Sequence, residues 1–153
     1  MKKQTARRIR TVGGVLFTIY MLLLVYLLFF AESYGRAQGL EEYHYNLVPF
    51  REIRRYLQYP DVLGPYAVMT NLAGNIIGFV PFGAILPVLK RNLRSFWKIL
   101  LLSFELSGMI EVTQLLTRVG SFDVDDIILN TLGGVLGYGI FAVCNHLRRK
   151  YYG

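Results

Sequence analysis

Long apolar runs alternate with shorter polar segments along this chain of 153 residues. A helix that crosses a membrane needs about 17–25 mostly apolar residues. Four stretches meet this requirement, at residues 12–30, 66–89, 97–117 and 126–144. The sequence therefore predicts an all-α integral membrane protein, built as a four-helix transmembrane bundle that forms a single domain over residues 1–153.

Composition and charge refine this prediction. Hydrophobic residues make up 54% of the chain, more than an ordinary soluble domain contains. Basic residues without neighbouring acids fill the N-terminal arm, the loop at residues 90–98 and the C-terminal end, whereas the acids gather in the other two connections. Because Lys and Arg in short loops stay on the cytoplasmic side, we expect both termini to be cytoplasmic. The net charge of +7 is then explained by topology and by attraction to membrane lipids, and no nucleic acid partner is expected.

A short amphipathic helix is predicted in the connection at residues 31–65, on the outer side of the membrane. Pro49 is a typical residue for a first helical turn. Phe50, Ile53 and Leu57 follow at the spacing of one helical face, which favours a helix over residues 49–58 lying in the membrane interface. Such a helix either anchors the connection in the interface or covers a site as a lid.

Each of the last three predicted spans has one face on which polar and small residues gather. At 100° per residue, each set falls within an arc of about 60–100°. The sets are Asn71, Gly74, Asn75 and Gly78; Ser103, Ser107, Glu111, Gln114 and Arg118; and Asp126, Asn130, Gly133 and Gly137. Since glycine leaves a helix surface smooth, the face of the last span with Gly133 and Gly137 allows close approach of another helix.

The polar side chains on these faces also lie at similar predicted depths, in the outer half of the membrane. They predict a pocket open to the outer leaflet, lined by Asn75, Glu111, Gln114, Arg118, Asp123, Asp126 and Asn130. The alternative is that these groups only bond the helices to one another, as amides and hydroxyls do in membranes. For Glu111 with Asp126 a functional role is favoured, because an ionised carboxylate is a poor choice for holding helices together.

An acidic cluster, Asp123, Asp125 and Asp126, precedes and begins the last span. Its oxygen ligands suit Mg²⁺ or Ca²⁺. The alternative, which we favour, is that the acids compensate the dipole at the N-terminus of a helix. No cofactor is therefore predicted.

Glu105 does not belong to the predicted pocket, because it lies about 120° around the helix from Glu111 and about 9 Å deeper. Three explanations remain for it: a neutral carboxyl, a carboxyl paired with another group, or a position at the bottom of a cavity. Pro81, inside the second span, is expected to bend or break its helix, which would widen the bundle on one side.

Several motifs in order along residues 46–138 carry a family resemblance. They are Asn46-Leu47-Val48-Pro49-Phe50, the run at residues 74–83, Ser107 with Glu111-Val112-Thr113-Gln114, and Arg118 with the run at residues 121–134. Together they resemble the VanZ-like family of bacterial membrane proteins. A member of that family is associated with resistance to the lipoglycopeptide teicoplanin, so the resemblance implies an envelope-facing role in the cell membrane of Gram-positive-type bacteria. It does not imply that this chain confers resistance.

Two mechanisms remain for such a pocket. In the first, it binds a lipid-linked cell-wall precursor or a lipoglycopeptide, with Asn46, Asn75, Gln114, Arg118, Asp123 and Asn130 as binding residues. In the second, it is the active site of a hydrolase or transferase, and Glu111 or Asp126 acts as the catalytic general base. No known catalytic motif favours the enzyme. A transporter is disfavoured because no inverted repeat is visible, although a homo-oligomer could still build a pore.

Overall fold

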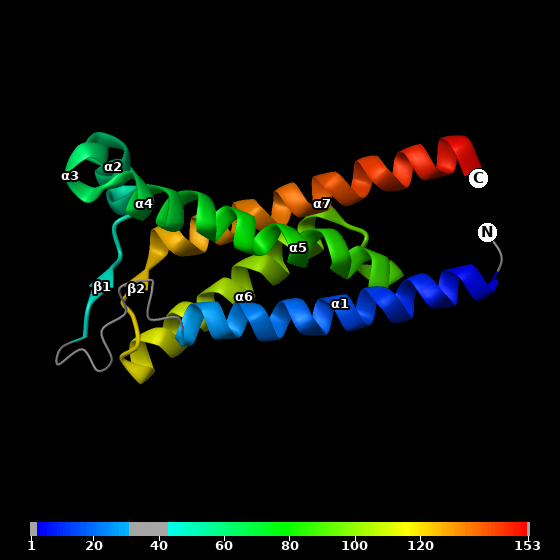
Figure 1. Ribbon diagram of the computed structural model, residues 1–153, viewed down its shortest axis with the longest axis horizontal. Coiled ribbons are helices and arrows are strands. Elements are labelled where there is room, and N and C mark those ends of the chain that lie inside the picture. The colour runs from blue at the N-terminus through cyan, green and yellow to red at the C-terminus, as the bar shows by residue number, and fades with distance from the viewer. Residues whose placement is uncertain (1–2, 31–42, 153) are drawn as a thin grey trace.

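Four long helices form an elongated bundle in the computed structural model, which describes residues 3–30 and 43–152 (Figure 1). They are α1 (Lys3–Phe29), a composite helix over Pro65–Leu89, α6 (Phe96–Thr117) and α7 (Val124–Tyr152). Each contains a stretch long and apolar enough to cross a membrane. The four predicted spans are thus confirmed as helices. Residues 31–42 of the predicted outer connection lie outside the described residues.

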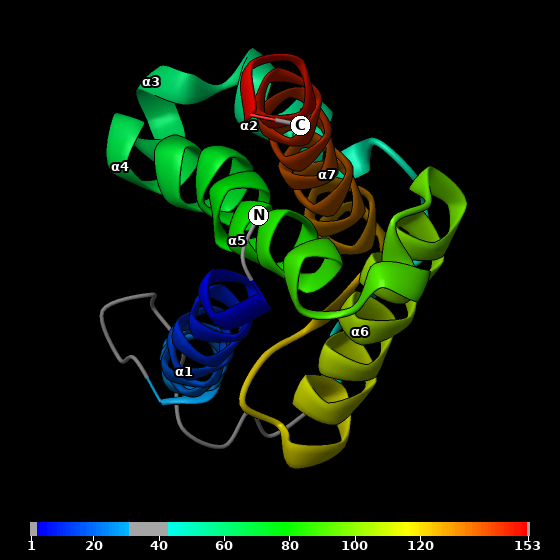
Figure 2. The same cartoon turned by 90° about the vertical axis from the view of Figure 1, so that its right-hand side faces the viewer.

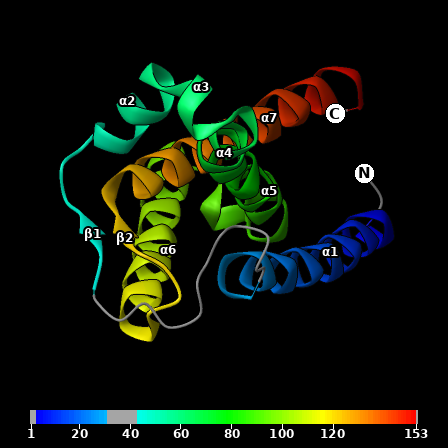
Figure 3. The same ribbon diagram turned by 60° about the vertical axis from the view of Figure 1, so that its left-hand side comes forward.

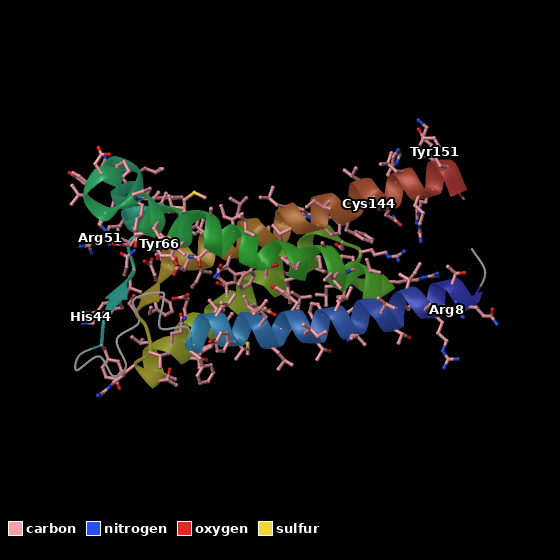
Figure 4. All side chains as sticks on the ribbon, viewed as in Figure 1. Arg8, His44, Arg51, Tyr66, Cys144 and Tyr151 are labelled. Atoms are coloured by element: carbon pink, nitrogen blue, oxygen red, sulfur yellow. The ribbon has the colours of Figure 1, made fainter. Side chains whose placement is uncertain are left out.

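The two ends of the bundle are built differently. The beginning of α1 and the end of α7 lie at one end, and the short elements between α1 and the second long helix lie at the other (Figure 1). We call the end that carries the short elements, with residues 43–68 and 118–123, the loop end. Figure 4 shows Arg51 at the loop end and Arg8 at the opposite end. This arrangement fits termini that share one side of a membrane, and the cytoplasmic assignment of that side stays a prediction.

The predicted interfacial helix is present as α2 (Arg51–Gln58), followed by α3 (Pro60–Leu63). Its start differs from the prediction, because Phe50 precedes the helix with a left-handed backbone, φ 65° and ψ 8°. Phe50 therefore does not share a helical face with Ile53 and Leu57. The physical reason lies in the contact that the Phe50 N–H makes with another helix, described below.

A very short parallel strand pair was not predicted. β1 (Tyr45–Asn46) pairs with β2 (Phe122–Asp123), with Tyr45 opposite Phe122 and Asn46 opposite Asp123. The two strands lie side by side in Figure 3. They fasten the connection before α2 to the segment that leads into α7.

The second long helix is a composite of three segments. It begins with α4 (Pro65–Val68), continues through a π-helical segment, η2 (Met69–Ala73), and ends with α5 (Gly74–Leu89). Asn71 lies in the π-helical segment and donates to the carbonyl of Ala67 at 2.8 Å, within its own helix. The irregular part of this span therefore lies towards the loop end.

Pro81 does not break its helix, contrary to one of the predicted outcomes. Helix α5 continues through both Pro81 and Pro87. The hydroxyl of Tyr20 in α1 donates to the carbonyl oxygen of Gly78, three residues before Pro81, at 2.8 Å. Neighbouring helices can satisfy backbone groups near a proline in this way, which lets the helix persist.

Glycines bring α5 and α7 into backbone contact. A Cβ added at Gly83 would lie 1.8 Å from the carbonyl oxygen of Gly134. A Cβ at Gly133 would lie 2.1 Å, and one at Gly137 2.0 Å, from a backbone carbonyl oxygen of α5. The predicted close approach on the glycine face of the last span is therefore confirmed. Side chains at these positions would force the two helices apart.

Helix α1 packs on the bundle through a small apolar cluster. Leu24 is buried together with Phe79 of α5 and Ile110 of α6. Viewed along the bundle, α1 lies beside α5 and α7 lies on the other side of α5, while α6 packs on α7 (Figure 2). Most of the apolar surface of α1 is exposed, as expected for a helix that faces lipid.

Candidate functional site at the loop end

Asp125, at the beginning of α7, caps the N-terminus of α2. Its side chain is 1% exposed, and its carboxylate accepts hydrogen bonds from the backbone N–H groups of Phe50 at 2.5 Å, Glu52 at 2.7 Å and Ile53 at 3.1 Å. Helix α2 has no side-chain cap of its own. Orphan N–H groups at a helix start need an acceptor, and a carboxylate there is also favoured by the helix dipole. Asp125 thus holds the outer helix on the bundle.

The strand pair places Asn46 against Asp123. The Asn46 side-chain amide donates to Oδ1 of Asp123 at 2.9 Å, and its oxygen accepts from the N–H of Val48 at 3.1 Å. The same Asp123 oxygen accepts from the N–H of Asp125 at 2.8 Å. Asn46 is buried, and both the nitrogen and the oxygen of its side-chain amide make a hydrogen bond within the protein.

Glu111 joins this group from α6. Its carboxylate accepts a hydrogen bond from the backbone N–H of Asp123 at 2.9 Å, and its side chain is only 2% exposed. Asn46, Asp123 and Glu111 therefore form a continuous hydrogen-bonded chain across β1, β2 and α6. We call these three residues the polar chain.

Burial changes the titration of one member of the polar chain. Desolvation raises the pKa of the Asp123 carboxyl above its ordinary value. Hydrogen bonds from the Asp125 N–H and from Asn46 act in the opposite direction and lower this pKa, but they do not offset the burial. The polar chain thus contains a carboxyl that holds its proton more readily than an exposed aspartate does.

A second polar contact connects α5 with α7. The Asn75 side-chain amide donates to Oδ1 of Asp126 at 2.6 Å. The prediction placed both residues on the wall of one pocket. The structure brings this pair into direct contact.

Asn130 and Gln114 make contacts between helices. The Asn130 amide donates to the hydroxyl of Ser107 at 2.8 Å, joining α7 to α6. The Gln114 amide donates to the carbonyl of Leu28 at 2.9 Å, joining α6 to α1. Both side chains are buried. These contacts correspond to the alternative in which polar groups bond the helices together.

Arg118 lies at the surface and ends α6. Its backbone is left-handed, with φ 56°, and its side chain is exposed. The guanidinium lies 4.7 Å from the centre of the Tyr43 ring, a cation–π distance, and Nη2 lies 3.4 Å from the Tyr43 hydroxyl. Arg118 is therefore presented at the loop end, where it can reach a ligand from outside the bundle.

The three acids of the predicted cation cluster engage different partners. Asp125 accepts from α2, Asp123 from Asn46, and Asp126 from Asn75. Within residues 3–30 and 43–152, no group of three His, Cys, Asp or Glu side chains is arranged to hold a metal ion. The positions of these carboxylates are accounted for by hydrogen bonds within the protein.

Glu105 lies on the outside of the bundle rather than at the bottom of a cavity. Its side chain is exposed, as are those of Leu101, Met109 and Val112 on the same side of α6. The opposite side of this helix, with Ser103 and Ser107, is buried in the bundle. The explanation by an internal cavity is therefore wrong, because the packed face of α6 points the other way.

The capping role of Asp125 was missed by sequence reasoning, which treated this residue only as one of three neighbouring acids. A signal for it was present. The predicted outer helix begins at Pro49, and the residue before it, Val48, cannot cap it as a Ser, Thr, Asp or Asn would. A helix start of this kind, next to a bundle, needs an acceptor from elsewhere in the chain.

Comparisons with known proteins agree on one family. A model of the VanZ/LLP1 family matches residues 17–145. Protein VanZ of Enterococcus faecium is 29% identical over 142 residues, which cover 88% of this chain and 77% of that protein. No solved structure matches. The matched region contains the polar chain, Asp125 and all four long helices except the first part of α1 and the last part of α7.

Proposed function

Because this chain belongs to the VanZ/LLP1 family, we propose that it is a bacterial membrane protein whose loop end faces outward and binds a cell-envelope molecule. The ligand is a lipid-linked cell-wall precursor or a lipoglycopeptide. Its polar part binds at the loop end, and its lipid tail lies along the apolar helices. A contribution to teicoplanin-type glycopeptide resistance follows from the same proposal, through the distant relationship to Protein VanZ of Enterococcus faecium.

The observation that supports this proposal best is the polar chain of Asn46, Asp123 and Glu111. Groups of this kind are costly inside an apolar bundle unless they serve a structure or a site. Asn46 and Glu111 are buried, whereas Asp123 is only partly buried and Tyr45, next to Asn46 in β1, is exposed, so the polar chain lies close to the surface of the loop end.

The exposed surface of the loop end fits an anionic ligand with a lipid tail. Arginines and tyrosines are exposed on it: Arg51, Arg54, Arg55, Arg118, Tyr43, Tyr45, Tyr59 and Tyr66. Arginine pairs with phosphate and carboxylate groups through its planar fork, and tyrosine rings prefer the depth of lipid head groups. A phosphate-linked lipid or an acidic lipoglycopeptide would bind the arginines through its anionic groups and would lie at the depth of the tyrosine rings.

Drug susceptibility in cells that produce the protein tests this function. Glu111→Gln and Asp126→Asn should abolish any protection against teicoplanin and any envelope phenotype, while the amount of protein in the membrane stays the same. Asp61→Asn is the matched control, because Asp61 is exposed on α3 and lies outside the polar chain. If all three variants behave like the parent protein, a functional site at Glu111 and Asp126 is refuted.

A catalytic function is the second candidate. Glu111 is 2% exposed and bonds to the backbone of Asp123, whose carboxyl has a raised pKa, so two acids with different environments lie together. In this case Glu111 or Asp126 acts as a general base in hydrolysis of, or transfer from, a lipid-linked precursor. Mass spectrometry of envelope lipids incubated with the purified protein separates the two functions. A converted product supports catalysis, and an unmodified lipid that stays bound supports binding alone.

A further inference from the structure

Glu105 is placed where a carboxyl group is most costly, on an exposed face in the middle of a long apolar helix. It lies 9 residues after the first residue of α6, Phe96, and 12 residues before the last, Thr117. These separations correspond to about 13 Å and about 18 Å along the helix. A carboxyl at this depth that faced only lipid chains would be strongly unfavourable.

The residues around Glu105 form a continuous exposed stripe. Leu101, Met109, Val112 and Leu116 are 55%, 66%, 46% and 69% exposed. At 100° per residue, all of them lie within about 40° of Glu105 around the helix. The packed face of α6 is on the other side. The stripe is therefore a separate surface of the bundle, and we call it the Glu105 face.

Gly108 makes the Glu105 face suitable for close contact with another helix. It lies one turn from Glu105 towards the loop end, and a Cβ built on it would have no atom within 4 Å. In α5 and α7, by contrast, the glycines at the interface are already in contact with backbone of the neighbouring helix. Gly108 is thus a small residue on an open face, and small residues at such positions let helices approach in membranes.

Within residues 3–30 and 43–152, no Lys or Arg side chain forms an ion pair with Glu105. The four predicted spans contain one basic residue, Lys98, which lies in the first turn of α6, about 10 Å along the helix from Glu105. Its ammonium group donates to the carbonyl of Asn92 at 2.8 Å, in the loop before the helix. An acid-form carboxyl is both a donor and an acceptor, so two such groups satisfy one another. In a two-fold dimer whose copies share one membrane orientation, the same residue of each copy lies at the same depth.

We propose that the Glu105 face is the interface with a second copy of this chain. The two Glu105 carboxyl groups form a hydrogen-bonded pair across the two-fold axis, and Gly108 of each copy lets the helices approach. The occupant is a second copy because a pair of identical carboxyl groups needs no other partner. This interface is independent of the loop end, so it can exist whether or not the envelope ligand is the one proposed above.

Disulfide cross-linking in native membranes tests the interface. Cys144 is first replaced by Ser, because it is the single native cysteine and is exposed. A cysteine is then introduced by Leu101→Cys or by Val112→Cys on the Glu105 face. The matched control is Val143→Cys, since Val143 is 60% exposed but lies on α7. We expect oxidation to produce a dimer of this chain from at least one of the two variants on the Glu105 face and not from the control.

Substitutions of Glu105 then test the carboxyl pair. Glu105→Leu should lower the association constant of the dimer about tenfold, whereas Glu105→Gln, which keeps a donor and an acceptor, should preserve it. Gly108→Leu should also weaken the dimer with the carboxyl intact. Equal cross-linking of the control, cross-linking only to a chain of different mass, or an unchanged dimer in Glu105→Leu would each overturn the proposal. The cross-linking comparison needs no substitution at Glu105, so it decides even if that variant fails to fold.

Discussion

The carboxylate of Asp125 in α7 accepts a hydrogen bond from the backbone N–H of Glu52 in α2 at 2.7 Å, across 73 positions of the sequence. The same carboxylate also accepts from Phe50 and Ile53. One buried side chain thereby fixes both the start of the outer helix and its position on the bundle. The left-handed backbone of Phe50 follows from this contact, since it turns the Phe50 N–H towards α7.

Replacing Asp125 by Ala should release α2 from the bundle. A hydrogen bond to a charged group contributes about 1.5–3 kcal/mol, and three donors lose their acceptor, so we expect a loss of more than about 2 kcal/mol in unfolding free energy. Hydrogen exchange should show faster exchange at the amides of Glu52 and Ile53, with little change in α6. Asp61→Asn serves as control. Unchanged protection of these two amides would contradict the capping role.

The raised pKa of Asp123 predicts a pH dependence of stability. The folded protein keeps a proton on this carboxyl at pH values where the unfolded chain, with a pKa of about 3.9, has released it. The unfolding free energy contributed by Asp123 therefore rises as the pH falls through the raised pKa, and the rise ends below about pH 3.9. Asp123→Asn should remove this contribution. Thermal unfolding in detergent at a series of pH values measures it, and identical pH profiles for variant and parent would show that Asp123 does not titrate in this way.

The glycine contacts between α5 and α7 predict that two Gly→Ala substitutions differ greatly in their effect on the unfolding free energy. Gly83→Ala places a Cβ 1.8 Å from the carbonyl oxygen of Gly134, so the helices must separate, and we expect a loss of about 2 kcal/mol or more. Gly139→Ala, in α7, meets no atom within 4 Å and should be neutral or stabilising by up to about 1 kcal/mol. Thermal unfolding of both variants in the same detergent tests the packing. Similar effects of the two would argue against the close contact.

The orientation of the bundle can be tested by labelling single cysteines in intact cells. In the Cys144→Ser background, Ser121→Cys lies at the loop end and Asn92→Cys lies in the basic loop between α5 and α6, and both original residues are exposed. The distribution of basic residues predicts that a maleimide unable to cross the membrane labels the first and not the second. The reverse pattern would place the loop end in the cytoplasm and would exclude an outward-facing site.

Local patterns were sufficient to predict much of the fold. The four long helices, the short outer helix and the close approach at Gly133 and Gly137 follow from hydrophobic periodicity and from the spacing of small residues. These features depend on residues that are near one another in sequence. The continuity of α5 through Pro81 did not follow, because it depends on the surroundings of that helix, among them the hydroxyl of Tyr20 in α1.

The candidate site was predicted as a set of residues rather than as a set of contacts. Sequence reasoning selected Asn46, Asp123 and Glu111, but it did not predict that a strand pair would join them, since this pairing connects segments 77 positions apart. Sequence reasoning also left open whether Glu105 faces a cavity or the outside of the bundle, because contacts between distant segments decide this. Which face of α6 is packed depends on where α7 lies.

Binding of an envelope molecule to the purified protein is the most direct test of the proposed site. Native mass spectrometry in detergent should detect a complex with a lipid-linked cell-wall precursor or with teicoplanin for the parent protein and for Asp61→Asn. For Arg118→Gln and Glu111→Gln we predict affinities lower by about tenfold or more, since the first removes an exposed guanidinium at the loop end and the second changes the carboxyl group of the polar chain. Equal affinity in all four proteins, or no complex with either class of ligand, would contradict a binding site at the loop end.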